Sequence, residues 1–354
     1  MINRRTRPIA ASIAAVCCIA AAHTGGTSAS PAADPNRAPA RLVDTGLYAD
    51  GKSLTIDARN RPFVPQYPLW SDGLTKRRWV YLPAGAQIDG GDEDAWDFPV
   101  GTRFWKEFSL NDRKVETRLL WKSSPGRWVF ATYMWNDEGT DAVLAPESGA
   151  PGGVEIVPGR QHHIPSTADC AACHGTRRPA PLGFNALQLS PDRDPHAIHA
   201  EPLQPGMITL QTLVEDGTLA GARPDLLARP PRIAASSPTA RAIAGYLAAN
   251  CGICHDGSGE IAAVVPSLTY RDVRDGDAAL RRLVDQRSRW QIPGTPEGSN
   301  VLVRSGAPDH SVVFVRMRSR SPSSQMPPLG SAVRDQQALE AIAGWISRDP
   351  VRSH

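Results

Sequence analysis

Alternating hydrophobic and polar positions predict a β-rich segment in the first half of the chain. Along 115–121 every second residue is hydrophobic or threonine, while Glu116 and Arg118 take positions between them. This period of two is typical of a strand with one buried face. Similar short runs cover 78–82, 102–110, 114–122 and 128–135. Because Pro125-Gly126 favours a tight turn, the last two runs should form a hairpin, and we expect an antiparallel β-sandwich-like domain over residues 41–160.

Helical patterns dominate the second half. Arg229-Pro230-Pro231-Arg232 predicts an extended boundary, because successive prolines cannot continue a helix. After it, Ser237 is placed to cap a helix that ends at Asn250, and a last helix is expected from Asp335 to Ser347. Two mainly α-helical regions, 161–232 and 233–350, should therefore follow the β-rich domain.

The first 29 residues have the layout of a secretory signal peptide. Arg4, Arg5 and Arg7 precede an apolar run over 8–22, and small residues continue to position 29. The apolar run is too short for a permanent membrane anchor. Cleavage after Ala22 and after Ala29 both fit, and residues 30–40, rich in Pro and Ala, predict a flexible lead-in. We expect a periplasmic protein of a bacterium, with no membrane anchor.

Composition and charge narrow the possible functions. The chain has 354 residues, of which 41% are hydrophobic and 21% charged, as expected for two or three globular domains. Removing residues 1–29 takes away three of the 39 basic residues and no acidic one, so basic residues then match the 36 acidic ones. A nearly neutral chain gives no support for a nucleic-acid partner.

Two C-x-x-C-H motifs carry the candidate chemistry. Cys170, Cys173 and His174 form the first motif, and Cys251, Cys254 and His255 form the second. Of the six cysteines, two lie in the leader and the remaining four all belong to the motifs. This motif attaches c-type haem: both thiols bond to the porphyrin and the histidine becomes the proximal iron ligand. We therefore expect two covalently bound haem c groups, with iron bound by His174 and His255.

Other readings of these cysteines fit less well. A zinc site would leave each cysteine pair without well-spaced partner ligands, and a thioredoxin-like pair does not need a following histidine twice. The β-rich segment has no histidine between His23 and His162, so a histidine-type metal site is not expected there. Its carboxylates, such as Asp97, Glu107 and Glu116, are dispersed along the strands, so we expect them on solvated strand faces rather than in a catalytic pair. We expect this domain to dock or support the haem regions.

The order of features over residues 236–348 resembles class I cytochrome c. A first helix ends in the second motif, Pro266 follows, Met326 precedes two prolines, and a last helix carries Trp345. The resemblance implies that Pro266 supports His255 through its carbonyl and that Met326 is the distal ligand. A thioether is a soft ligand suited to ferrous haem, and the prolines stiffen its loop. His/Met ligation raises the reduction potential and leaves no place for substrate, so electron transfer is expected there.

Two further expectations concern the same region. The resemblance implies that Gly245 and Trp345 form a small–large pair where the first and last helices cross. Arg316, Arg318 and Arg320 alternate with other residues just before Met326, which predicts a cationic face on an extended segment. That face is either a docking patch for a redox partner or an ordinary solvated surface.

The distal ligand of the first haem stays open at this point. The candidates are His162, His163, His196, His199 and Met207. His162 lies eight residues before Cys170, and an extended chain of that length reaches at most ~29 Å, enough to wrap to the opposite haem face. An open distal face is the remaining alternative.

Six short segments extend the resemblance to nearly the whole chain after the leader. They are 67–72, 98–102, 116–120 and 133–136, with 163–166 and 181–184 on either side of the first motif. With them the chain resembles bacterial periplasmic dihaem c-type cytochromes that carry a Trp-rich β domain. The resemblance implies electron transfer between redox protein partners. The alternatives are a dihaem peroxidase-like oxidoreductase with an open first haem, and a haem subunit docked on a dehydrogenase.

Overall fold

The computed structural model describes residues 37–150, 153–175, 181–258, 262 and 265–348. The expected signal peptide, with both candidate cleavage sites, and most of the lead-in lie outside the described residues. In the described part, no helix has both the length and the hydropathy needed to cross a membrane.

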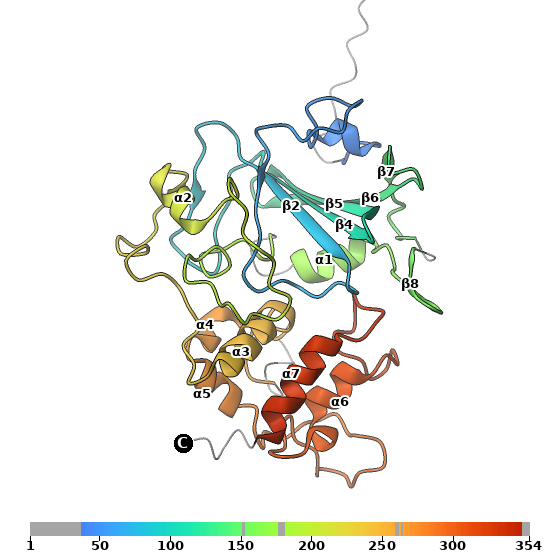
Figure 1. The fold of residues 1–354 in the computed structure, drawn as a ribbon, viewed down its shortest axis with the longest axis vertical. Helices are drawn as coiled ribbons and strands as arrows, with labels where there is room; N and C mark the ends of the chain where they lie inside the picture. The colour runs from blue at the N-terminus through green and yellow to red at the C-terminus, as the bar shows by residue number, and fades with distance from the viewer. Residues whose placement is uncertain (1–36, 151–152, 176–180, 259–261, 263–264, 349–354) are drawn as a thin grey trace, which may run out of the picture. The chain divides into compact units, whose positions relative to one another are not determined.

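Six antiparallel strands form the main sheet, in the order β1-β2-β4-β5-β6-β7 (Figure 1). They are β1 (Arg61–Pro62), β2 (Thr75–Tyr81), β4 (Arg103–Leu110), β5 (Arg113–Ser124), β6 (Arg127–Trp135) and β7 (Ala142–Leu144). The four predicted runs are all strands, and β5 and β6 form the predicted hairpin. Gly126 at its turn has a φ of 69°, which a residue without Cβ adopts at little cost.

The β-sandwich prediction is wrong for the described residues. Besides the main sheet, β3 (Ile88–Asp89) pairs with β10 (Leu219–Ala220), and β8 (Glu155–Val157) pairs with β9 (Arg160–Gln161), in two-stranded ladders. One face of the main sheet buries Trp79, Trp105 and Leu119 against the segment 38–56. The other buries Val80 and Phe104 against the segment 184–227. An irregular segment therefore supplies the layer that a second sheet was expected to supply.

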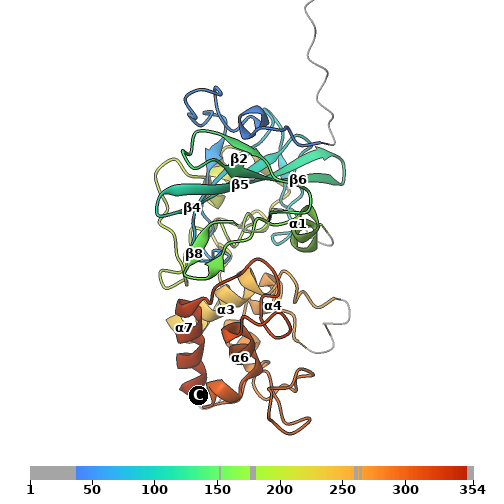
Figure 2. The same ribbon diagram turned by 90° about the vertical axis from the view of Figure 1, so that its right-hand side faces the viewer.

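Short helices lie within the irregular parts of the chain. They are η1 (Leu42–Thr45), α1 (Thr167–His174), α2 (Leu210–Glu215) and η3 (Pro308–His310). The side chain of Ser166 accepts a hydrogen bond from the Asp169 amide, and the Asp169 carboxylate accepts one from the Ser166 amide. This capping box sets the start of α1. Helix α1 packs against β6 (Figure 2).

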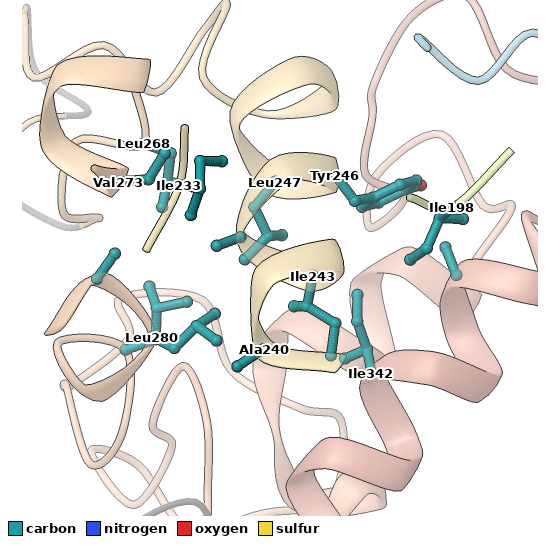
Figure 3. Packing of buried hydrophobic residues seen from close by; sticks show 14 of the residues in the cluster. Ile198, Ile233, Ala240, Ile243, Tyr246, Leu247, Leu268, Val273, Leu280 and Ile342 are labelled. Atoms are coloured by element: carbon teal, nitrogen blue, oxygen red, sulfur yellow. The ribbon is translucent and has the colours of Figure 1, made fainter. Parts of the chain in front are cut away.

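The remaining helices are α3 (Pro238–Asn250), α4 (Tyr270–Val273), α5 (Gly276–Arg281), α6 (Val312–Arg318) and α7 (Gln336–Ser347). Ser237 caps α3 as predicted, because its side chain accepts from the Ala240 amide. Asp335, predicted as the first residue of the last helix, is the cap of α7 and accepts from the Ala338 amide. Apolar side chains of α3 fill the centre of this region (Figure 3). They meet Leu280 of α5 and Ile342 of α7 in one buried cluster.

Gly245 of α3 contacts Tyr67 rather than Trp345. A Cβ built on Gly245 would lie 2.1 Å from the ring of Tyr67, which is 2% exposed. The Tyr67 hydroxyl lies 3.3 Å from Asp194 Oδ2, so this ring is held in place. The expected Gly245–Trp345 pair is therefore wrong, because Gly245 makes room for the ring of Tyr67, which precedes β2. The two residues are 178 positions apart in the sequence, so a local sequence pattern could not predict their contact.

We expect Gly245→Ala to lower the free energy of unfolding by about 1–3 kcal/mol, because the added methyl group overpacks against Tyr67. Gly344→Ala in α7 is the matched control, since a Cβ there meets only the Arg348 side chain, at 3.6 Å. Replacing a helix glycine by alanine in open space should stabilise the protein by roughly 0.5–1 kcal/mol. Urea denaturation followed by tryptophan fluorescence measures both, and equal effects of the two variants would contradict the tight contact.

Candidate functional site

Both C-x-x-C-H motifs lie at the C-terminal ends of helices. Helix α1 ends at His174 and contains the first motif, while Cys251 caps α3. The Cys251 amide donates to the Leu247 carbonyl, and the His255 amide donates to the Cys251 carbonyl, each at 2.8 Å. These bonds continue the helical course through the second motif. Residues three and four positions apart then lie on one side of the helix, so each motif presents two thiols and an imidazole together.

The two motifs are close to each other in space. The pKa of the Cys173 thiol is raised, first by burial and next by the charge that a Cys254 thiolate places nearby. Gly252 and Ile253, which lie between the cysteines of the second motif, also line the cavity beside His174. Groups held by the two motifs would therefore be neighbours.

A cavity of about 220 Å³, the second cavity, lies beside the second motif. Its walls are mainly aliphatic and include Leu247, Val265, Leu268, Leu283, Leu302 and Val312. Cys251, His255 and Met326 line the same space. The structure thus brings a thiol, an imidazole and a thioether, predicted from distant parts of the sequence, around one apolar cavity. This donor set fits a covalently attached haem with His/Met ligation.

His255 has the protonation state that an iron ligand needs. Burial, and next the charge of Arg316, lower the pKa of His255, so its imidazole is neutral near pH 7. Its Nδ1 is buried and has no hydrogen-bond partner among the described residues. The bond from Nδ1 to the Pro266 carbonyl that the resemblance implied is therefore not formed. Instead, the Leu268 amide donates to the His255 carbonyl at 2.8 Å and holds this segment in place.

A second methionine, Met317, lines the same cavity and was missed in the sequence. It lies on α6, is 7% exposed, and follows Val313 by one helical turn on the same cavity wall. The helical spacing of these two residues is the signal that could have revealed it. Met326 lies in the loop after α6, where its amide donates to the Arg316 carbonyl at 3.0 Å. Two thioethers therefore lie within reach of the space beside His255.

The predicted cationic face is wrong, because Arg316 and Arg318 belong to α6 rather than to an extended segment. Helical residues two positions apart differ in direction by about 200°. Arg316 lies over the Trp290 ring and lines the second cavity. Arg318 pairs with Asp309 at 2.6 Å, and Arg320 donates to the Met317 carbonyl at 3.1 Å. The three guanidinium groups have separate surroundings and form no common patch.

A separate cavity of about 160 Å³, the first cavity, lies beside His174 of the first motif. Strands β2, β4 and β5 form one wall, which carries Arg78, Phe104, Lys106, Arg118 and Leu120. The segment 181–188 and the end of α3 form other walls. The His174 ring lies 5.8 Å from the ring of Phe130 on β6. This space is enclosed by aromatic, aliphatic and basic side chains, which also suit a haem, because its macrocycle is apolar and its propionates are anionic.

The structure speaks against His162 as the distal ligand at this cavity. His162 is 2% exposed, its Nδ1 lies 3.0 Å from Asp72 Oδ2, and its Nε2 lies 3.0 Å from Glu116 Oε1. Both ring nitrogens are therefore taken by carboxylates and neither is left for iron. The sequence did not show this arrangement because its partners lie 90 and 46 positions away.

None of the other four candidates lines the first cavity either. His163 and His196 are exposed. His199 Nε2 lies 2.8 Å from Asp335 Oδ1, and its ring stacks on Trp70. Met207 Sδ accepts from the Gln204 amide at 3.4 Å. In the described part of the chain, none of the five predicted distal ligands therefore lines the first cavity.

A buried chain of charged groups joins the surroundings of the two cavities. Asp72 Oδ1 accepts hydrogen bonds from the amides of Ala332 and Val333, which follow the Met326 loop. Its Oδ2 meets His162, which in turn meets Glu116, and Arg118 Nε donates to the same Glu116 oxygen at 3.0 Å. Arg118 then lines the first cavity. The expectation of a solvated Glu116 was wrong: it is fully buried, and His162, from outside the predicted β domain, contacts its carboxylate.

The charges of these four groups, two carboxylates, one imidazole and one guanidinium, sum to zero when His162 is protonated. Burial acts to lower the pKa of His162, but hydrogen bonds to Asp72 and Glu116 outweigh it and raise the pKa above 6.5. Burial acts to raise the pKa of Glu116, but the Arg118 charge and the hydrogen bonds from His162 and Arg118 lower it overall. Each ionised group therefore supports the ionisation of its neighbour.

The raised pKa of His162 predicts a pH-dependent contribution to stability. This contribution is fully present below pH 6.5, the ordinary histidine pKa, and is lost as pH rises through the higher folded value. We expect the loss of unfolding free energy in His162→Gln to be larger at about pH 6 than at about pH 9. Denaturant titrations of both proteins at the two pH values measure the difference. An effect that does not change with pH would contradict a protonated His162.

Comparisons with protein-family models, with curated proteins and with solved structures found no match to this chain. Across the described residues there is also no group of three or more His, Cys, Asp or Glu side chains placed to hold a metal ion. What the protein does is therefore inferred from its two motifs and the cavities beside them.

Proposed function

We propose that this protein is a dihaem c-type cytochrome that relays electrons between redox partners. The observation that carries the proposal is the second cavity, where Cys251, His255 and Met326 surround one apolar space. Class I cytochrome c has this set of residues in this order between a first and a last helix, and the chain supplies both helices as α3 and α7. The first motif presents His174 to a cavity in the same way.

The residues around the second cavity suit electron transfer rather than catalysis. A haem bound there supplies a one-electron couple between ferric and ferrous iron. Cys251 and Cys254 would hold it covalently, and His255 and Met326 would occupy both axial positions, which leaves no position for substrate. The mainly aliphatic walls lower the local dielectric, which raises the reduction potential. The closeness of the two motifs suits transfer from one haem to the other.

A second candidate, a peroxidase-like oxidoreductase, is favoured by one observation at the first cavity. None of the His and Met candidates for a distal ligand lines it, whereas Arg118 and Lys106 do. A haem with an open distal face beside basic groups suits a small oxidant such as peroxide. The relay and the peroxidase therefore differ in the coordination of the first haem.

Covalent haem is tested on the exported protein, made in bacteria that attach haem c. We expect the intact mass to include two haems. Cys170→Ala/Cys173→Ala and Cys251→Ala/Cys254→Ala should each remove one of them, because each pair of thiols forms one set of thioether bonds. A wild-type protein without covalent haem would overturn the proposal.

Electron paramagnetic resonance of the oxidised protein, repeated after half-reduction, distinguishes the two functions. Two low-spin ferric signals mean that both irons have two axial ligands, and they support the relay. A high-spin signal, or one that arises on half-reduction, means an open first haem. Peroxide turnover by wild-type protein, and its loss in Cys170→Ala/Cys173→Ala, would then favour the peroxidase.

A further inference from the structure

Three cationic side chains form a row across the main sheet. Arg78 on β2 lies directly opposite Lys106 on β4, and Lys106 lies directly opposite Arg118 on β5. All three line the cavity beside His174. Side chains paired in this way have Cβ atoms about 4.5–5.5 Å apart, and like charges at that spacing destabilise a sheet. A row of this kind needs negative charge close by.

Protein carboxylates supply that charge at the two ends of the row. Arg78 donates to both oxygens of Glu201, at 2.6 and 2.9 Å. Arg118 donates to Glu116, as described above. These two ion pairs leave the middle of the row uncompensated.

Lys106 is the middle member and has no ion pair or hydrogen bond with any described residue. Its ammonium lies 5.0 Å from the centroid of the Phe108 ring, which is a weaker contact than an ion pair. The side chain is half-buried and lines the cavity. Asp94, the one carboxylate among the described lining residues, lies 4.0 Å from Arg271.

The surroundings make an unpaired charge at Lys106 costly. Burial, and next the charges of Arg78 and Lys76, lower the pKa of Lys106 well below its usual value. An anion in the cavity would offset this cost and hold the lysine in its charged form.

We propose that Lys106, flanked by Arg78 and Arg118, binds a carboxylate-like oxyanion at the sheet wall of the first cavity. This inference rests on the proposed function, because the first source of such an anion is a propionate of the haem held by Cys170 and Cys173. A soluble oxyanion that enters beside an open haem has the same chemistry. An ammonium is a compact point charge with three donors, which suits either ligand.

The test uses holoprotein whose mass shows two attached haems, so that a failure of haem attachment counts against the proposed function and not against Lys106. Lys106→Met removes the charge at similar side-chain length, and Lys106→Arg keeps it. Lys114→Met is the matched control, because Lys114 also lies over an aromatic ring, that of Trp135, but lines neither cavity. A redox titration gives the midpoint potential of each haem.

We expect Lys106→Met to shift the reduction equilibrium of the first haem toward the ferric state about tenfold, which is about 59 mV for a one-electron couple. The cation favours the less positive, reduced site, so its loss lowers the potential. Lys106→Arg and Lys114→Met should leave this potential near the wild-type value, and the second haem should change little in all three. If Lys106→Met does not accumulate, Lys106→Gln removes the same charge and should shift the potential in the same direction.

A phosphate titration separates the two sources of the anion. A saturable change in the first haem's potential that is lost in Lys106→Met identifies a soluble oxyanion, whereas no saturable change identifies the propionate. An unchanged potential in Lys106→Met would overturn the proposal. So would a first haem that is low-spin in the wild type and high-spin in both Lys106→Met and Lys106→Arg, since that change would make Lys106 an iron ligand.

Discussion

Replacing Glu116 with alanine should lower the free energy of unfolding by about 3–5 kcal/mol, because it removes one partner from a buried set of charges. Glu116 is fully buried, and its Oε1 accepts hydrogen bonds from both Arg118 and His162. Without the carboxylate, two groups that carry positive charge keep only Asp72 as a buried counter-charge. The loss should exceed that of an ordinary surface substitution several-fold.

Glu138→Ala is the control for this effect, because Glu138 is exposed in the turn after β6 and should change stability by less than about 0.5 kcal/mol. Glu116→Gln keeps the shape and one hydrogen-bond acceptor, so its loss should fall between those of the two alanine variants. Denaturant unfolding of the wild-type protein and the three variants, followed by tryptophan fluorescence, gives the differences. Equal stability of Glu116→Ala and Glu138→Ala would contradict the inference that the buried charges of Arg118 and His162 depend on Glu116.

The elements of this fold that depend on neighbouring residues could be predicted from the sequence. The alternation around Val115 predicted β5, the Pro125-Gly126 turn predicted the hairpin, and Ser237 and Asp335 marked the starts of α3 and α7. Hydrophobic period, turn residues and caps act over a few residues, so the sequence displays them directly. The sequence also predicted that Cys251, His255 and Met326 belong to one site, and all three line the second cavity.

Features that depend on distant residues could not be predicted in this way. A strand pattern shows which face is apolar but not what covers the other one, so Glu116 was expected in solvent and a second sheet was expected opposite the first. The same limit applies to Gly245, whose partner Tyr67 comes from the β domain. It applies again to His162, whose two carboxylate partners fill both ring nitrogens.

The buried charged chain gives the β domain a specific role beside the two motifs. Asp72 holds the amides of Ala332 and Val333, and through His162 and Glu116 it connects to Arg118 at the first cavity. Strand β5 therefore supplies charge to the wall of one cavity, and the loop before β2 fixes the backbone that follows the methionine loop of the other. A supporting domain of this kind links the geometry of both sites.

The proposed function predicts that replacing Met326 with alanine changes the second haem from low-spin to high-spin and lowers its reduction potential by on the order of 0.2 V. Axial ligands set haem potentials within a span of about 0.8 V, and a thioether favours ferrous iron over ferric iron. Without Met326 this stabilisation of the ferrous state is lost. Redox titration and electron paramagnetic resonance of the holoprotein measure the two effects, and the first haem should keep its spin state and potential.

The variant Met317→Leu tests whether Met326, as the sequence predicts, or Met317 supplies the thioether ligand of the second haem. Met317 lines the same cavity as Met326, but it is buried on α6, whereas Met326 belongs to a loop followed by two prolines. Leucine replaces its volume without a sulfur, so a packing role predicts a low-spin second haem with a nearly unchanged potential. If Met317→Leu gave the high-spin haem and Met326→Ala did not, the iron would be bound from α6. The loop methionine would then pack against the haem edge, because one axial position accepts only one sulfur.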